Sequence, residues 1–348
     1  MFPIPADPLA QRLLLNALPG VGPATVRRLR DAFGGDLAAA LRARPAELAR
    51  IKGVGTRLAA TVAARDFDWA AELARVEALG FRVVADGAPD WPLAFAPLWD
   101  PPLVLYAEGA ALPGERAVAI VGSRHCTAYG AGLARRFARE LAAAGWWIVS
   151  GLARGIDTAA HEGALDADGR TVAVLGHGLD LTYPPEGRAL RARMRERGGV
   201  LSEFPLGRPA DRQSFPQRNR IVAALVRAVV VIETDVDGGS LITARFAGDL
   251  GKTLCAVPGR VDSPASRGCH ALLRDGATLV TGVDDILREL GEARDLATLP
   301  LPSPTAPAPE HARWLRPFAG GTAHDAESLA EATHCAPAEA AAMLALLE

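Results

Sequence analysis

The sequence has 348 residues, of which 49% are hydrophobic, and a formal net charge of −2 at pH 7. This length fits two or three domains, and no apolar run reaches the roughly 20 residues that a membrane-spanning helix needs. The first eight residues lack a basic stretch followed by an apolar segment, so we expect no secretory signal, a cytoplasmic protein and no membrane partner.

The cysteines and histidines argue against a metal site. The four cysteines show no Cys-x-x-Cys spacing, and the seven histidines form no cluster typical of metal ligands. We therefore expect reduced thiols and neither metal nor other cofactor.

Residues 1–65 are predicted to form a small all-α domain. Two pairs of short helical segments each reverse at a Gly-Val-Gly hinge, and the two hinges lie about 33 residues apart. Glycine permits the tight reversal, and free amides at the start of the next helix favour an anion. The pattern resembles a helix-hairpin-helix (SAM-like) domain, which clamps DNA backbones but also serves as a structural or protein-binding module. The candidate second DNA contact consists of Gly20, Gly22, Lys52, Gly53 and Gly55.

The charge of this first domain differs from that of the whole chain. Residues 1–65 contain ten basic and four acidic residues, a net charge of +6. A local basic surface that meets phosphates would explain this excess, and so would codon bias in an Arg-rich protein.

Residues 66–115 are interpreted as a connector that packs on the next domain. A helix is expected at 69–79 and an extended run at 81–84, followed by a stretch rich in proline and tryptophan. No chemistry is assigned to this segment.

Residues 116–290 alternate apolar runs with helical stretches, which is typical of a Rossmann-like, doubly wound, mostly parallel sheet. Strands are expected at 117–121, 146–150, 171–175, 200–202, 228–233, 253–257 and 277–280. Helices are expected near 129–144, 157–167, 186–197, 218–226, 240–251 and 284–290.

Four loops at the strand ends carry groups that suit phosphate. The first lacks the GxGxxG fingerprint of dinucleotide-binding proteins, which excludes NAD or FAD. Either of the first two loops alone fits a tight strand-to-helix turn slightly better than a phosphate site, but four such loops at one sheet edge favour a long surface for a polymer. These loops are Gly122-Ser123-Arg124, the run from Ser150 to Asp157, the run from Phe215 to Arg220, and the run from Gly238 to Ala244.

The motifs in this region resemble those of the DprA (Smf) family. The match runs in family order over about residues 1–290. The motifs are AIVGSR at 119–124, SGLARGID at 150–157, AVLGHGLD at 173–180, YPPE at 183–186, SEFP at 202–205, RNR at 218–220, GSLITA at 239–244 and AVPG at 256–259.

The resemblance implies a non-catalytic protein of natural transformation. Such a protein would bind and protect incoming single-stranded DNA, load the RecA recombinase, and form a homodimer through the Rossmann-like domain. Two positions depart from the family pattern: Gly187 replaces an asparagine before Arg188, and His270 replaces another. The implied DNA-binding residues are Gly122, Ser123, Arg124, Ser150, Gly151, Arg154, Gly155, Arg188, Arg218, Asn219, Arg220, Gly239, Ser240 and Thr243.

The C-terminal part is expected to be a Pro-rich linker at 291–310 and a short helical domain at 311–348. Helical runs at 326–333 and 337–347 outline a truncated winged-helix-like tail, in which two basic and five acidic residues give a net charge of −3. An acidic tail on a linker also fits a protein-docking adaptor.

Enzymatic alternatives rest on three groups of residues. A LOG-like nucleotide-processing phosphoribohydrolase would need an acid after the glycines at 238–239, and no carboxylate stands at that spacing. Ser150, Asp157 and His161 could suggest a triad, but no GxSxG elbow is present. Glu233 and Asp235 could suggest a metal, but no phosphate-loop lysine accompanies them.

Overall fold

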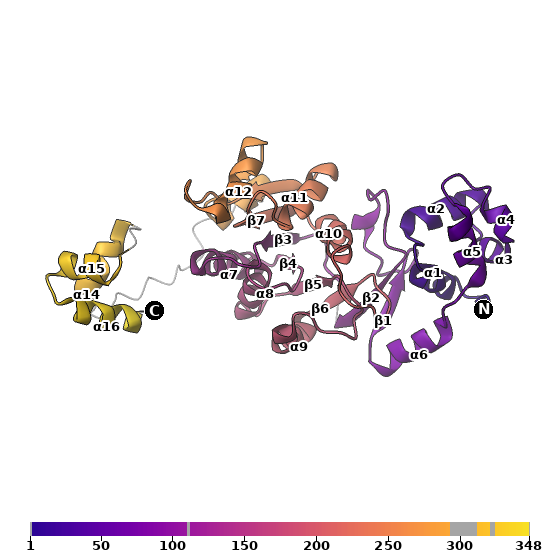
Figure 1. The fold of residues 1–348 in the computed structure, drawn as a ribbon, viewed down its shortest axis with the longest axis horizontal. Helices are drawn as coiled ribbons and strands as arrows, with labels where there is room; N and C mark the ends of the chain where they lie inside the picture. Colours follow the sequence, from indigo (N-terminus) through magenta and orange to yellow (C-terminus); the bar gives the residue numbers. More distant parts are fainter. Residues whose placement is uncertain (1, 110–111, 293–311, 321–323, 348) are drawn as a thin grey trace. The chain divides into compact units, whose positions relative to one another are not determined.

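The structure, a computed structural model, describes residues 2–109, 112–292, 312–320 and 324–347. The chain divides into two compact units, Met1–Ala293 and Arg294–Glu348 (Figure 1). Apart from residues 291–292, the expected linker at 291–310 lies outside the described residues.

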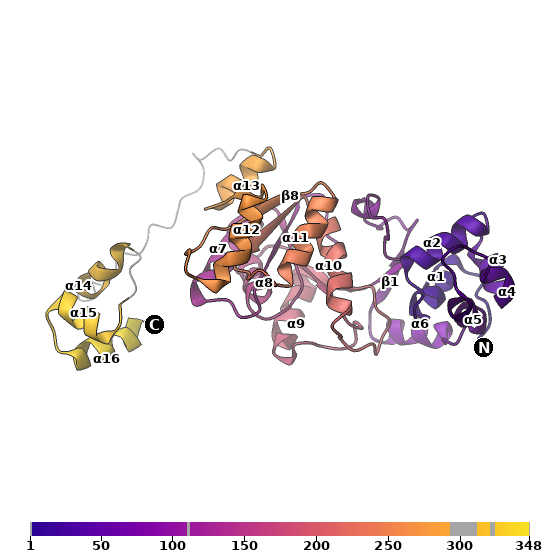
Figure 2. The same ribbon diagram turned by 45° about the horizontal axis from the view of Figure 1, so that its top comes forward.

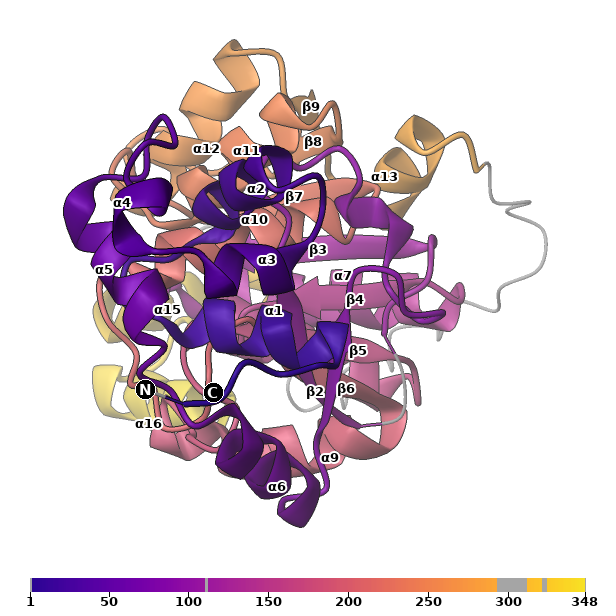
Figure 3. The same cartoon turned by 90° about the vertical axis from the view of Figure 1, so that its right-hand side faces the viewer.

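The first unit begins with five helices that enclose a small apolar core. Asp7 caps the first helix by accepting a hydrogen bond from the Ala10 amide, and Pro23 occupies the first turn of the second. Gly20 and Gly53 adopt φ values of 77° and 83° at the two hinges, a conformation that favours glycine. Figure 3 shows these helices in front of the sheet. They are α1 (Pro8–Ala17), α2 (Pro23–Ala32), α3 (Leu37–Arg42), α4 (Pro45–Leu48) and α5 (Thr56–Ala64).

A nine-stranded sheet forms the centre of the first unit, in the order β1-β2-β6-β5-β4-β3-β7-β8-β9. The β1–β2 and β2–β6 pairs are antiparallel and the remaining pairs are parallel, which confirms the predicted doubly wound, mostly parallel fold. The strands are β1 (Arg82–Ala85), β2 (Val104–Gly109), β3 (Ala117–Gly122), β4 (Trp147–Ser150), β5 (Thr171–Leu175), β6 (Gly198–Ser202), β7 (Ala228–Ile232), β8 (Thr253–Ala256) and β9 (Thr278–Leu279).

Helices cover both faces of this sheet, because the central strands are apolar on both sides. Val118 and Ile120 of β3 pack with one helical layer, whereas Ala117 and Ala119 pack with the other. Figures 1 and 2 show these layers on opposite sides of the strands. One layer contains α7 (Ala128–Ala143), α8 (Ile156–Asp166), α9 (Arg188–Arg197) and α13 (Val283–Glu289). The other contains α10 (Ser214–Ala224), α11 (Ser240–Asp249) and α12 (Pro264–Arg274).

Part of the expected connector belongs to the sheet. Strands β1 and β2 fall within residues 66–115 and extend the sheet past β6 in antiparallel fashion. Residue 115 therefore does not mark the edge of the sheet. Helices α3 and α12 were also not predicted.

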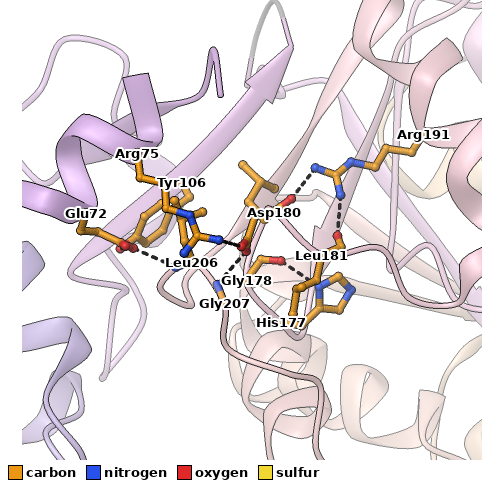
Figure 4. A network of polar contacts seen from close by, with 11 residues as sticks. Glu72, Arg75, Tyr106, His177, Gly178, Asp180, Leu181, Arg191, Leu206 and Gly207 are labelled. Atoms are coloured by element: carbon orange, nitrogen blue, oxygen red, sulfur yellow. Dashed lines mark hydrogen bonds and ion pairs between the residues drawn. The ribbon is translucent and has the colours of Figure 1, made fainter. Parts of the chain in front are cut away.

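A partly buried polar network fastens helix α6 (Trp69–Ala78) to the core (Figure 4). Glu72 accepts hydrogen bonds from the Tyr106 hydroxyl at 2.9 Å and from the Leu206 amide at 2.8 Å. Arg75 contacts the Asp180 carboxylate at 2.5 Å, and Asp180 also accepts a bond from the Gly207 amide at 2.7 Å. These contacts hold the loop that follows β5, which carries four residues of the cavity described below, His177, Leu181, Thr182 and Tyr183.

The second unit is helical over its described residues. Trp314, Leu329, Ala330 and Ala340 are its buried apolar residues. Its helices are α14 (Ala312–Leu315), α15 (Ala326–Thr333) and α16 (Pro337–Leu347), the last two as predicted. Across the described parts of both units, no helix combines the length and apolar character needed to cross a membrane.

Candidate nucleic-acid interface

An open cavity of about 970 Å³ lies at the carboxyl ends of the parallel strands. Strand β3 pairs with β4 on one side and with β7 on the other, so the chain direction across the sheet reverses at β3. Open α/β sheets bind ligands at such a switch point. The predicted site residues that line the cavity are Gly122, Ser123, Arg124, Gly151, Arg218, Asn219, Gly239, Ser240 and Thr243.

Arg124 is an exposed cation on this cavity. Its guanidinium lies 4.6 Å from the centre of the Phe215 ring, and the Phe215 and Tyr183 rings are 6.1 Å apart. Tyr183 is 45% exposed, and both rings also line the main cavity. An arginine beside two accessible rings can bind a phosphate and stack an unpaired base.

The start of helix α11 offers a second group that suits a phosphate. Its N-cap is Gly239, which makes no side-chain cap bond and has open space where a Cβ would stand. The amides of Gly239 and Ser240 make no hydrogen bond to backbone or side-chain atoms in the described part of the chain, which leaves them for an anion. The Asn219 amide holds this turn by donating to the Gly239 carbonyl at 3.3 Å.

The side chains of Ser240 and Thr243 serve the packing of the helix. The Ser240 hydroxyl donates to Thr234 Oγ1 at 2.7 Å, and Thr243 is buried. Ser240 and Thr243 therefore shape the cavity wall through their backbone and packing. The Ser240 hydroxyl is already used in its bond to Thr234.

His177 presents an unpaired acceptor at the cavity wall. Its Nδ1 lies 3.0 Å from the Gly178 carbonyl, an arrangement that places the proton on Nδ1 (Figure 4). Nε2 is then a lone-pair acceptor, and it is buried without a hydrogen-bond partner in the described structure. Burial lowers the pKa of His177, so the ring is neutral at pH 7.

The turn after β4 does not offer the free anion nest expected from its sequence. Buried Ser150 donates to the Ile120 carbonyl at 2.7 Å. The Gly151 and Ala153 amides donate to the carboxylate of Asp157 at 3.1 Å and 3.4 Å. Asp157 therefore occupies the place that a phosphate would take, and we remove Ser150 from the proposed site.

The Arg218–Arg220 run lies inside helix α10, although the sequence predicts it just before a helix. Arg218 is 5% exposed and donates to the Gly151 carbonyl at 2.9 Å and to the Val174 carbonyl. Arg220 is 2% exposed and forms ion pairs with Glu203 at 2.6 Å and Asp100 at 3.2 Å, outside the cavity. Arg218 is thus part of the wall, and Arg220 is excluded from the proposed site.

Two of the predicted glycines are needed for packing between loops. A Cβ on Gly122 would lie 1.9 Å from the Ile232 carbonyl oxygen. A Cβ on Gly155, whose φ is 75°, would lie 2.3 Å from the Ser123 carbonyl oxygen. Both residues permit the close approach of neighbouring strand ends and bring Ser123 and Arg124 to the cavity.

Arg154 and Arg188 lie beside the main cavity. Arg154 is exposed, pairs with Glu186, and lines a smaller adjoining pocket together with Arg124 and Tyr183. Arg188 is the exposed first residue of α9 and does not line either pocket. The geometry therefore brings Arg154 to the site but leaves Arg188 apart from it.

Comparison with known proteins identifies the family. A family model described as DNA recombination-mediator protein A matches residues 82–291, more than half of the chain. The chain belongs to this family. A second model, described as a SAM-like helix-hairpin-helix tandem, matches residues 12–64.

Relatives of the DNA recombination-mediator protein A family align over most of the chain. The putative DNA processing protein DprA of Mycobacterium tuberculosis is 45% identical over 261 residues, which cover 70% of this chain and 67% of the relative. The solved DprA structure from Streptococcus pneumoniae has a TM-score of 0.68 at 33% identity, covering 80% of this chain and 95% of that one. DNA processing protein A from Helicobacter pylori, whose structure is described for its single-stranded-DNA-binding mode, has a TM-score of 0.54 at 32% identity, covering 60% of this chain and 95% of that one.

In this family member, the two hinges of the small domain each precede an uncapped helix. The N-cap residues Gly22 and Gly55 make no side-chain hydrogen bond at the starts of α2 and α5. Gly20, Lys52 and Gly53 are exposed, while Gly22 is half-buried. DNA contact by these hinges stays a prediction.

The groups considered for catalysis have structural partners. The Glu233 carboxylate accepts bonds from the Thr127 amide at 2.7 Å and its hydroxyl at 2.5 Å. Buried His161 accepts a bond from the Leu152 amide at 3.3 Å and contacts the Thr171 hydroxyl at 2.7 Å. Within the described ranges, no group of three or more His, Cys, Asp or Glu side chains is arranged to hold a metal.

Proposed function

We propose that this chain binds single-stranded DNA along the carboxyl edge of its sheet and catalyses no reaction there. The observation that carries the proposal is the cavity where Arg124, the uncapped start of α11, and the Phe215 and Tyr183 rings face one space. Phosphates would meet Arg124 and the α11 amides, and a base would stack against the rings. The Helicobacter pylori relative described as binding single-stranded DNA supports this assignment.

A single strand suits these groups better than a duplex does. The Tyr183 ring, from a loop, and the Phe215 ring, from the first turn of α10, line a concave cavity, and the bases of a duplex are already stacked and paired. In side-by-side anisotropy titrations at one salt concentration, we expect tighter binding to a single-stranded oligonucleotide than to the duplex of the same sequence. Equal or tighter duplex binding would contradict the proposal.

Replacing Arg124 with alanine should weaken single-strand binding about 10- to 100-fold, because a charge-assisted hydrogen bond contributes about 1.5–3 kcal/mol. The weakening should be similar for all sequences, and the slope of log affinity against log salt should flatten by about 0.7 for each phosphate that the variant no longer binds. Arg124 is exposed and forms no ion pair within the described residues, so the melting temperature should stay unchanged.

The matched control is Arg136→Ala, which removes an exposed arginine of α7 that does not line the cavity. This control should leave affinity and salt slope as they are. An Arg124→Ala protein that melts earlier while keeping its salt slope would assign Arg124 a role in loop order and would remove it from the site.

The finer assignments follow from the family. DNA processing proteins named DprA from Bacillus subtilis and Streptococcus pneumoniae are 36% and 41% identical to this chain over 215 and 210 residues. We propose that this chain acts in the cytoplasm in natural transformation, as a homodimer that protects incoming single strands and loads RecA onto them. RecA filament assembly on strands bound by this protein, and light scattering of the protein alone, test the two partner assignments.

Two alternatives are less well supported. The cavity residues Ser240 and Thr243 are engaged or buried, and the loop acids that line the cavity, Asp235 and Asp237, precede the glycines, so no carboxylate stands after them at the spacing that phosphoribohydrolase chemistry needs. A protein-docking adaptor would not need Arg124 and two aromatic rings on one cavity.

A further inference from the structure

A second cavity, of about 490 Å³, lies between the small domain and the segment that precedes β2. Helices α1 and α2 contribute Arg12, Arg27 and Arg30 to its lining, and the facing segment contributes Leu98 and the Pro101–Pro102 pair. In Figures 1 and 2 this purple segment lies between α2 and α10. The cavity contains none of the hinge residues predicted to contact DNA.

The charges of this cavity favour an anion. Arg30 is paired with Asp86 at 3.6 Å, and Asp31 is the other acid of the lining. Arg12 and Arg27 form no ion pair with any carboxylate in the described residues; each donates instead to a backbone carbonyl, those of Pro8 and Trp99. Two guanidinium groups are therefore available to phosphate oxygens without breaking an ion pair.

An exposed tryptophan stands beside these arginines. Trp99 is 63% exposed, and the Arg27 guanidinium lies 6.0 Å from the centre of its ring. The backbone at Trp99 is anchored by both neighbouring residues, because Leu98 is buried in the core and Asp100 pairs with Arg220 at 3.2 Å. A fixed, accessible indole next to cations is a stacking surface for an unpaired base.

Helix α10 connects the two cavities. Phe215 at its start lines the sheet-edge cavity, and Arg220 five residues later holds the Trp99 segment through Asp100. Five residues of α-helix advance about 7.5 Å along the axis. Helix α10 thus helps to position both stacking surfaces, the Phe215 ring and the Trp99 ring.

We infer that the second cavity is a further contact for the same DNA strand, with a phosphate between Arg12 and Arg27 and a base on Trp99. The inference rests on the proposed single-strand binding at the sheet edge and extends the strand's path toward the small domain. It also gives buried Arg220 a role, since that side chain positions the Trp99 segment.

The test is a length series of thymidine oligonucleotides, with about 6 nucleotides to fill one cavity and about 30 to reach both. The double variant Arg27→Gln/Trp99→Ala should bind the long oligonucleotide about tenfold more weakly and the short one unchanged, since the variant no longer stacks one base or holds one phosphate. Arg124→Ala should weaken both lengths. Trp99→Phe, which keeps a ring, should retain most of the affinity, and the exposed Leu93→Ala on the same segment should change nothing.

The outcomes separate the two proposals. Equal weakening at both lengths, or no weakening at either length in a double variant with an unchanged melting temperature, would overturn the second contact and leave sheet-edge binding intact. A wild-type protein that binds only long strands, with Arg124→Ala without effect, would overturn the sheet-edge site and keep the second contact. Failure of the wild-type protein to bind any oligonucleotide would contradict both.

Discussion

Replacing Arg218 with methionine should lower the free energy of unfolding by about 3–5 kcal/mol, the range for leaving a buried charge uncompensated. Burial lowers the pKa of Arg218 to about 10, so the side chain is charged at neutral pH and compensates buried Asp157. Burial raises the pKa of Asp157, and the charge of Arg218 opposes that rise. The substitution would also leave the Gly151 and Val174 carbonyls without their donor.

Urea denaturation of the wild type, Arg218→Met and the neighbouring Asn219→Ala provides the measurement. The Asn219 variant should lose less stability, because this half-buried, uncharged side chain donates one long bond to the Gly239 carbonyl and accepts one from Arg218 Nε at 3.1 Å, and its loss leaves no buried charge uncompensated. Adding Asp157→Asn to Arg218→Met should recover part of the stability, since no buried charge then stays unpaired. A decrease below about 1 kcal/mol would mean that Arg218 is not held in the wall and is free to contact DNA directly.

Acidification from pH 7.5 to pH 5 should destabilise the protein through His161. Burial lowers the pKa of His161 to about 3, and the nearby charge of Arg218 adds to this effect, whereas an unfolded histidine titrates near 6.5. Below about pH 6.5, His161 binds a proton in the unfolded chain but stays neutral in the folded chain. The stability is therefore present above pH 6.5 and falls by about 1.4 kcal/mol per pH unit toward the folded pKa, or about 2 kcal/mol by pH 5.

His161→Gln isolates this contribution. Glutamine has an acceptor for the Leu152 amide and a donor for Thr171, and it does not titrate. Whatever its stability at pH 7.5, its free energy of unfolding should change less between pH 7.5 and pH 5 than that of the wild type. His177, whose pKa burial also lowers, contributes equally to both proteins, so parallel curves would refute the assignment to His161.

The sheet could be predicted because its strands are short apolar runs buried on both faces. All five residues of β5 and of β7 are buried, and no polar residue interrupts β7. Such runs are recognisable in the sequence, and the loops that follow parallel strands must share one edge. The shared edge explains why Arg124 and Gly239 could be predicted to meet at one cavity, although they are far apart in the chain.

One misplaced helix boundary explains why Arg218 and Arg220 do not both reach the cavity. Helix α10 begins at Ser214, four residues before the predicted start. Successive residues of a helix are rotated by about 100°, so Arg218 and Arg220 point in nearly opposite directions and cannot face one cavity. A loop would have allowed both to reach the ligand. The capping contacts of Asp211 with the Ser214 amide, at 2.7 Å, were the missed signal.

Other features needed the tertiary structure. Strands β1 and β2 are separated by a Pro-rich stretch, and their pairing with β6 depends on residues far away in the chain. Tyr183 and His177 were not chosen as site residues, since nothing local distinguishes a ring that faces solvent from one that packs. The sequence feature that could have indicated these two residues is their position in the loop after a predicted strand. The sequence likewise identifies Asp157 only as a helical residue. It does not indicate that its carboxylate accepts the amide hydrogen bonds of the expected anion nest.

Helix α1 belongs to two hydrophobic cores at once. Leu13 packs with β2, α6 and α9, while Leu14 and Leu15 pack inside the small domain, and the Asn16 amide donates to the Glu203 carbonyl at 2.7 Å. No hinge can open between these cores without pulling one helix out of one of them. The small domain and the sheet should consequently melt in a single cooperative transition. A DNA strand that contacts both the small domain and the sheet would therefore bind two sites that stay at a constant distance from each other.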